Sequence, residues 1–209
     1  MTAALTKGER SRGKLVAATA ELLRRQGYHA TGLSEIVAES GAPRGSLYFY
    51  FPGGKDELAC AALTASGEEW RRRIAAAIEH TADLGAAIDA IVTLLADDLE
   101  ASGYQHGCPA AAVALEATSE PVRQTVAAHN AAWEAAIADR LVAFGIGRPL
   151  GRQLATVALA AIEGALLLAK VSRSRAPLST VGAALRAMAT TMQAPRRKRR
   201  TRRTGQRRA

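Results

Sequence analysis

Apolar residues recur three and four positions apart along most of the chain, the spacing that gathers them on one face of an α-helix. In residues 7–26, for example, Leu15, Ala18 and Leu22 share a face, and Gly27 is expected to end the helix. Further helices are predicted over residues 33–39, 43–51, 55–78, 84–101, 110–117, 121–144, 150–171 and 178–192. No segment shows the strict alternation of a half-buried strand, so the predicted fold class is all-α.

Composition agrees with this prediction and sets some limits. Of the 209 residues, 48% are hydrophobic, enough for a sizeable core, but only 4% are aromatic. A β-sandwich or barrel would be richer in aromatic and β-branched residues. The two cysteines, Cys60 and Cys108, form no disulfide framework and no Cys-x-x-Cys pair. No metal site and no cofactor are therefore expected.

The net charge of +9 belongs mainly to the end of the chain. Nine of the 28 basic side chains follow Pro195, and the remaining 19 equal the 19 acidic side chains in number. Residues 1–194 are thus neutral overall, and residues 195–209 are expected to be a disordered basic tail. A basic tail attracts DNA without reading its sequence.

Residues 33–52 have the layout of a helix-turn-helix (HTH). Ile36 and Leu47, eleven positions apart, are placed to pack the two short helices together, and Gly41 suits the turn between them. The second helix would then project a basic residue, a bare backbone and aromatic hydroxyls, which suit a DNA groove. Helical hairpins with a glycine turn are common, however, so spacing alone leaves open that Tyr48 and Phe49 are core residues.

The residues around this motif resemble the TetR family of bacterial transcriptional regulators. The match is dense over about fifty positions and rests on Leu22-Leu23, Gly27-Tyr28, Thr31, Glu35-Ile36-Val37, Gly41, Gly45-Ser46-Leu47-Tyr48, Tyr50-Phe51 and Lys55-Asp56-Glu57-Leu58. The chain departs from the usual family pattern at Val37, Ala42 and Pro43. It also has one residue more than many members in Pro52-Gly53-Gly54.

That longer loop, together with Gly107-Cys108-Pro109 and Leu115-Glu116, is similar to the LmrA/YxaF-type subgroup. The resemblance implies a two-domain helical fold. Residues 1–58 would form a three-helix DNA-binding domain, and residues 59–194 a larger helical domain for effector binding and dimerisation. By position, the resemblance assigns base or phosphate contacts to Arg44, Gly45, Ser46, Tyr48 and Tyr50. It assigns phosphate contacts to Thr31 and Lys55, and the longer loop makes the reach of Lys55 less certain.

The candidate effector residues are Cys108, Glu116, His129 and Trp133. In a chain with few aromatics, Trp133 one turn from His129 suits the wall of an apolar cavity. Trp133 as core and His129 as surface is an equally good interpretation. Glu116 is either a polar group of the pocket or an ion-pair partner of an arginine. Cys108 is interpreted mainly as a small buried residue, with a reactive sensor thiol as the alternative.

The last two predicted helices, about 150–171 and 178–192, carry more apolar surface than one neighbour covers. Pairing with the same helices of a second chain would give a four-helix homodimer interface. A monomer in which these helices are ordinary core is the alternative. Residues 154–170 are interrupted by Glu163 and are judged too short to span a bilayer comfortably, and no signal peptide is evident. A cytoplasmic location without membrane association is expected.

No enzyme constellation is evident: the chain lacks Gly-x-Ser-x-Gly and a P-loop. The predicted function is a DNA-binding regulator, by resemblance a repressor that binds a near-palindromic double-stranded operator as a dimer. A small apolar or aromatic effector would release it. The alternative is a sequence-tolerant, nucleoid-type DNA-binding protein that uses the arginine-rich tail.

Overall fold

The computed structural model describes residues 6–116 and 119–193, and within these ranges it contains nine α-helices and no strand. Their bounds are α1 Lys7–Ala30, α2 Leu33–Ser40, α3 Arg44–Tyr50, α4 Gly54–Ile78, α5 Leu84–Ala101, α6 Pro109–Ala114, α7 Glu120–Ala143, α8 Arg148–Ser172 and α9 Ala176–Gln193. The all-α prediction is confirmed, and most boundaries agree within a few residues. The predicted end of the sixth helix at residue 117 and the basic tail lie outside the described residues.

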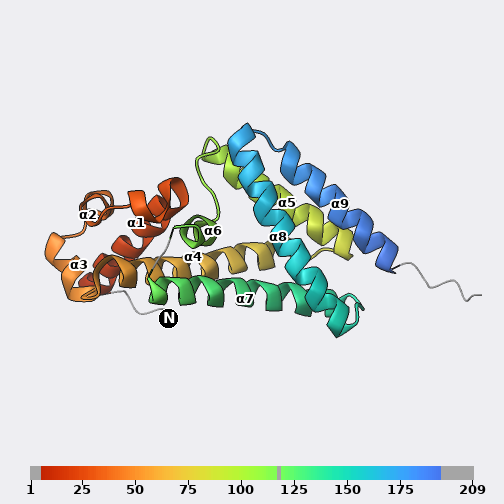
Figure 1. Cartoon of the computed structure of the whole chain (residues 1–209), viewed down its shortest axis with the longest axis horizontal. Coiled ribbons are helices and arrows are strands. Elements are labelled where there is room, and N and C mark those ends of the chain that lie inside the picture. The colour runs from red at the N-terminus through yellow and green to blue at the C-terminus, as the bar shows by residue number, and fades with distance from the viewer. Residues whose placement is uncertain (1–5, 117–118, 194–209) are drawn as a thin grey trace, which may run out of the picture.

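The molecule is elongated, with α1, α2 and α3 at one end and α5, α8 and α9 at the other (Figure 1). The long helices α4 and α7 pack against each other and run between the two ends. The short helix α6 lies near the middle and packs against α1. The two ends of the molecule are therefore connected through the long helices α4 and α7.

One apolar cluster holds the end with the predicted HTH together. It contains Ile36 of α2 and Leu47 of α3, both buried as their spacing predicts, and it continues into α4 with Leu58 and Leu63. Val113 of α6 belongs to the same cluster. The expected domain boundary after residue 58 therefore falls inside a continuous helix and a shared core, so the two parts are packed together and not joined by a linker.

Gly27 marks a kink in α1 and not its end. Its φ of +80° is the left-handed conformation expected of a helix-ending glycine, but a further turn reaches Ala30. The predicted stop at residue 27 is thus corrected, because the chain bends there and resumes. Gly41 has φ +58° in the turn between α2 and α3, as predicted for chain reversal.

The helix α8 is longer than its apolar stretch alone suggested. Its 25 residues make it long and apolar enough, by length and composition only, to cross a membrane, which corrects the judgement that the segment is too short. The extra length comes from the first turns, which include Arg148 and Arg152. In this fold α8 packs against α7 and α9, with a large part of its apolar surface exposed.

Candidate DNA interface and effector cavity

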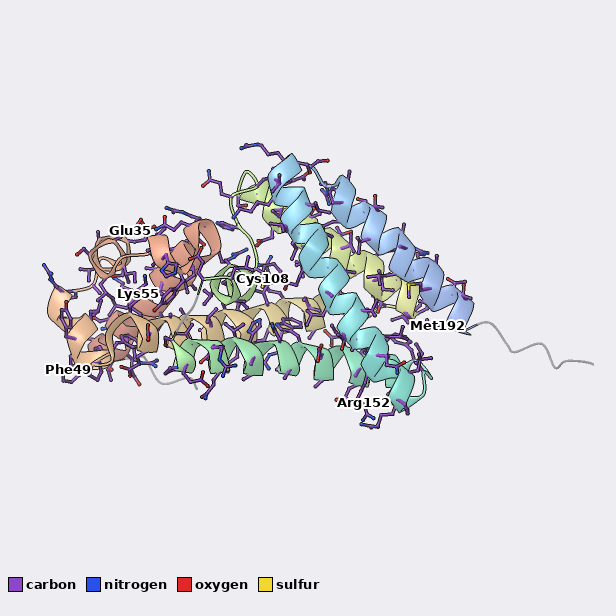
Figure 2. The ribbon with its side chains drawn as sticks, in the orientation of Figure 1. Glu35, Phe49, Lys55, Cys108, Arg152 and Met192 are labelled. Carbon is purple, nitrogen blue, oxygen red and sulfur yellow. The ribbon has the colours of Figure 1, made fainter. Side chains whose placement is uncertain are left out.

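The helix α3 presents its outer face at one end of the molecule, where Figure 2 shows Phe49. Tyr48 is 55% exposed and Phe49 is 76% exposed, while Arg44 and Gly45 are also exposed. Leu47 points the other way and is buried in the core, so it anchors the helix while Tyr48 and Phe49 remain exposed. Tyr48 and Phe49 are therefore surface residues and not the core residues that spacing alone allowed.

Two further predicted contact residues of α3 are half-buried. Ser46 lies near the start of the helix. Tyr50 turns back toward α1, where its hydroxyl lies against Gly8 so closely that a Cβ there would collide with it. Its ring also meets that of Phe49 edge to face, with centroids 4.8 Å apart. Tyr50 therefore fixes the position of α1 against α3 as well as lying at the predicted interface.

Thr31 and the side-chain amine of Lys55 both lie at the end of α1, but neither side chain points freely into solvent. Thr31 is fully buried, and its hydroxyl donates to the carbonyl oxygen of Gly27 at 2.7 Å. Its backbone N–H donates to the carbonyl oxygen of Tyr28 at 3.3 Å, so the residue offers no exposed group for the predicted phosphate contact. Nζ of Lys55 lies 4.2 Å from the centre of the Tyr28 ring and 3.5 Å from the carbonyl oxygen of His29. Burial lowers the pKa of Lys55, and the neighbouring Asp56 and Glu116 oppose that shift.

An apolar cavity of about 170 Å³ lies in the second half of the molecule. Its walls come from α1, α4, α5, α7, α8 and the segment before α6. Most of the wall is aliphatic, with the indoles of Trp70 and Trp133, which are the two tryptophans of the chain. Three of the four predicted effector residues line it, namely Cys108, His129 and Trp133. A lining that is mainly apolar with a few polar groups is typical of a site for a small apolar ligand.

The polar groups of the cavity are few and held in place. The indole N–H of Trp133 donates to Nε2 of His129 at 3.0 Å. Burial, with the nearby charge of Arg71, lowers the pKa of His129, so the neutral ring is favoured. The imidazole sits over Gly67, where an added Cβ would lie 2.7 Å from Nδ1. These contacts fix one wall between α4 and α7.

Cys108 lies immediately before α6, near the middle of the molecule (Figure 2). Its thiol is hydrogen-bonded to the carboxyl group of Glu163. Burial, together with the charge of Glu163, raises the pKa of the Cys108 thiol to about 12. A thiol of this kind stays protonated at neutral pH and is a poor nucleophile, which favours the packing role over the sensor role.

Sequence reasoning missed Glu163 as a cavity residue, although it was visible as the one acid inside an apolar stretch. Sequence also gave no sign that Arg24 and Asp98 line the cavity. Arg24 of α1 pairs with Asp98 of α5, and Arg73 of α4 joins the same carboxylate at 3.0 Å. These contacts form between residues far apart in the chain, so no local pattern reveals them.

Glu116 lies away from the cavity, and the prediction that it is a pocket group is corrected. Its carboxylate reaches the kink of α1, where Oε2 accepts the backbone N–H of His29 at 2.7 Å. A Cβ on Gly27 would lie 2.5 Å from its Oε1. The alternative prediction, an arginine partner, is not what the structure has either: the carboxylate binds backbone. The reason is that Glu116 follows α6 at the end opposite to Cys108.

Among the described residues, no group of three or more histidine, cysteine or acidic side chains is placed to hold a metal ion.

Comparison with known proteins places these features in a family. Residues 15–62 match the family model for bacterial regulatory proteins of the tetR family, and residues 85–184 match that for the C-terminal domain of LmrA/YxaF-like transcriptional regulators. An uncharacterized HTH-type transcriptional regulator of Mycobacterium tuberculosis is 38% identical over 182 residues, which cover 84% of this chain and 92% of that relative. The HTH-type transcriptional regulator LmrA of Bacillus subtilis is 35% identical over 170 residues, covering 80% of this chain and 90% of LmrA.

Solved structures agree on the fold. A regulatory protein TetR from Rhodobacter sphaeroides superposes with a TM-score of 0.77 at 22% identity, covering 85% of this chain and 97% of that one. A TetR-family regulator from Streptomyces coelicolor gives 0.74 at 21% identity, covering 88% and 96%.

Proposed function

The chain belongs to the TetR family of bacterial transcriptional regulators. We propose that this DNA-binding protein is a repressor, and that a small apolar or aromatic effector releases it from its operator. The observation that carries the proposal is the placement of α6. Cys108, before its first residue, lines the cavity, and Glu116, shortly after its last, binds the kink of α1 in the DNA-binding end. One short helix thus touches both the ligand site and the HTH domain.

The proposed DNA contacts lie on α3 and its neighbours. Arg44, Gly45, Ser46, Tyr48 and Tyr50 would read or flank bases in the major groove, as the exposure of most of them supports. We extend this set with Phe49, which is the most exposed side chain of the three aromatics and suits contact with a thymine methyl group. Lys55 would meet a phosphate.

The proposed homodimer forms through α8 and α9. Val157, Leu167, Leu168 and Val171 of α8 are exposed, as are Met188 and Met192 of α9. Ala160 and Gly164, also exposed on α8, allow a second helix to approach closely. Burying such a face against its own copy gives a two-fold dimer, and the two α3 helices would then read successive major grooves about 34–36 Å apart.

Effector release is proposed to work by linkage. Arg24 of α1 pairs with Asp98 on the cavity wall, and its Nε donates to the carbonyl oxygen of Gly107 at 3.4 Å. A ligand that moves the cavity wall therefore acts on α1 through this ion pair and through the contact between Glu116 and His29. The helix α4, which begins at the DNA-binding end and lines the cavity at Trp70, is the third connection. Such coupling amounts to about 1–3 kcal/mol, or roughly 5–150-fold in operator affinity.

The protein is not an enzyme, since its family and relatives are transcriptional regulators. We place it in the cytoplasm, where its DNA target lies, with the apolar face of α8 covered by a second copy and not by lipid.

Binding-site selection with the purified full chain tests the central proposal. We expect recovered DNA to contain a near-palindrome, and sedimentation to show a dimer that binds it. A library of small aromatic compounds should contain some that release this DNA. Selection that recovers no shared sequence, or a protein that stays monomeric at micromolar concentration, would refute the corresponding part.

The second candidate function is sequence-tolerant coating of DNA by the arginine-rich residues 195–209, which lie outside the described residues. A salt titration on operator and random DNA separates the two. Equal affinities with one steep slope favour coating, whereas a large specificity ratio favours the repressor. Removing residues 195–209 should flatten the slope and leave operator preference intact.

A further inference from the structure

The carboxyl group of Glu163 is the unusual feature of the cavity. It projects from α8 into a wall formed largely by aliphatic side chains, including Leu159, Ile162 and Leu166 of the same helix. Its hydrogen-bond partner is the thiol of Cys108, a weak and uncharged donor. A carboxyl group in such a setting normally has a cationic partner or several strong donors.

The cations near the cavity are already engaged elsewhere. Arg24 and Arg73 both pair with Asp98, and Nζ of Lys170 donates to the backbone carbonyl oxygen of Arg24 at 3.4 Å. Within residues 6–116 and 119–193, Glu163 takes part in no ion pair. The cavity therefore contains a carboxyl group, and no residue in these ranges supplies its counter-ion.

The two indoles of the cavity differ in what covers them. The Trp70 ring already has the guanidinium groups of Arg73 and Arg24 at 4.1 and 5.5 Å from its centre. Across the described part of the chain, no cation lies over the Trp133 ring, whose N–H is held by His129. Trp133 thus keeps an aromatic face that an aromatic ring or an organic cation can contact.

We propose that the effector is a lipophilic arylalkyl amine, whose protonated nitrogen pairs with Glu163 while its apolar part contacts Trp133 and the aliphatic wall. This inference rests on the proposed effector role of the cavity. It defines the ligand by charge as well as by apolarity, because the amine supplies the counter-ion that Glu163 lacks.

The surroundings also disfavour an anionic ligand. Asp98 and Glu163 both line the cavity, whereas the guanidinium of Arg24 on the same wall is held by Asp98. Burial raises the pKa of Glu163, and the hydrogen bond from Cys108 opposes that shift. A negative charge is therefore unfavourable at this part of the wall. An anionic ligand would meet the same desolvation cost, and the described residues of the wall offer no free arginine or lysine to offset it.

Three probes of similar shape test the proposal with the full-length wild-type protein. They are N,N-dimethyl-1-naphthylmethylamine, which is a cation at neutral pH, its uncharged carbon analogue 1-isobutylnaphthalene, and the 1-naphthylacetate anion. Calorimetry measures their affinities, and release of the selected operator measures their effect. We expect the amine to bind about tenfold more tightly than the carbon analogue, and the anion to bind most weakly.

The variant Glu163→Gln removes the charge and keeps the shape. The ratio of the affinity for the amine to the affinity for the carbon analogue should therefore fall to nearly one. Ser66→Ala, at another polar position of the wall, is the matched control and should keep the preference. Equal binding of amine and carbon analogue, or a preference that survives Glu163→Gln, overturns the inference. If Glu163→Gln does not fold, the ranking of the three probes on the wild-type protein still decides.

The outcomes also separate this inference from the proposed function. Binding and operator release by the carbon analogue or the anion, with no advantage for the amine, overturns the amine inference and leaves the effector cavity standing. Failure of all three probes to bind overturns the inference. The effector role of the cavity itself fails only if, in addition, no compound of the aromatic library releases the operator.

Discussion

The carboxylate of Glu116 occupies the space in which a side chain at position 27 would lie. A Cβ on Gly27 would stand 2.5 Å from Oε1, and Oε2 of the same carboxylate accepts the N–H of His29 at 2.7 Å. Two residues 89 positions apart thus meet at the kink of α1. This contact joins α6 to the DNA-binding end, which is why the position of Glu116 bears on regulation.

Gly27→Ala should destabilise the protein by about 1–3 kcal/mol, because φ is +80° there and the new methyl group meets the Glu116 carboxylate. Urea unfolding measures the change. Gly13→Ala is the matched control on the same helix, since nothing lies within 4 Å of its Cβ. It should stabilise by about 0.5–1 kcal/mol. Equal effects of the two substitutions would show that the kink is not constrained.

Glu116→Ala removes both the obstacle at Gly27 and the acceptor for His29. In this background Gly27→Ala should cost less than in the wild type, with a coupling of about 0.5–2 kcal/mol in a double-mutant cycle of unfolding free energies. Additive effects would mean that the strain at Gly27 comes from its backbone conformation alone.

Arg44→Ala and Tyr48→Ala should each weaken operator binding by about 1–3 kcal/mol without lowering thermal stability, since both side chains are exposed. Fluorescence anisotropy at several salt concentrations measures this, and Arg44→Ala should also reduce the salt slope by about 1 if it contacts a phosphate. Arg72→Ala, an exposed arginine of α4, is the control and should leave binding unchanged. Wild-type affinity in both α3 variants would place the DNA contact elsewhere.

Leu168→Asp should turn the proposed dimer into a monomer, because it places a charge in the centre of the exposed apolar face of α8. Sedimentation measures the change, and operator affinity should fall more than about tenfold with the loss of one half-site. Leu115→Asp is the control, because it makes the same change at a leucine that is 87% exposed and lies outside α8 and α9. It should leave the dimer intact. A Leu168→Asp protein that remains dimeric would exclude this face as the interface.

The Cys108 thiol should react slowly with iodoacetamide at pH 8. Its pKa of about 12 leaves almost no thiolate at that pH, and the thiolate fraction rises only as the pH approaches this value. Peptide mass spectrometry of alkylated protein measures the rate, with urea-unfolded protein as the reference for an accessible thiol. Labelling of folded Cys108 at the unfolded rate would revive the sensor interpretation.

Local pattern was enough for the helices and for the HTH. The buried pair Ile36 and Leu47 and the left-handed Gly41 lie within twelve residues, so helical spacing and backbone sterics specify them without knowledge of the rest. The cavity residues were predicted less well. Trp133 and His129 share one turn and were found together, but Glu163, Asp98 and Arg24 come from three other helices, and only packing brings them to the same wall.

The sequence by itself determined the helices, the turn of the HTH and the family. Tertiary structure decided what several residues do. It turned Glu116 from a supposed pocket group into the partner of Gly27 and His29, buried the hydroxyl of Thr31, and placed Glu163 in the cavity. The physical reason is range: helix formation and turns depend on neighbours a few residues away, whereas a cavity and its charges depend on which distant helices pack together.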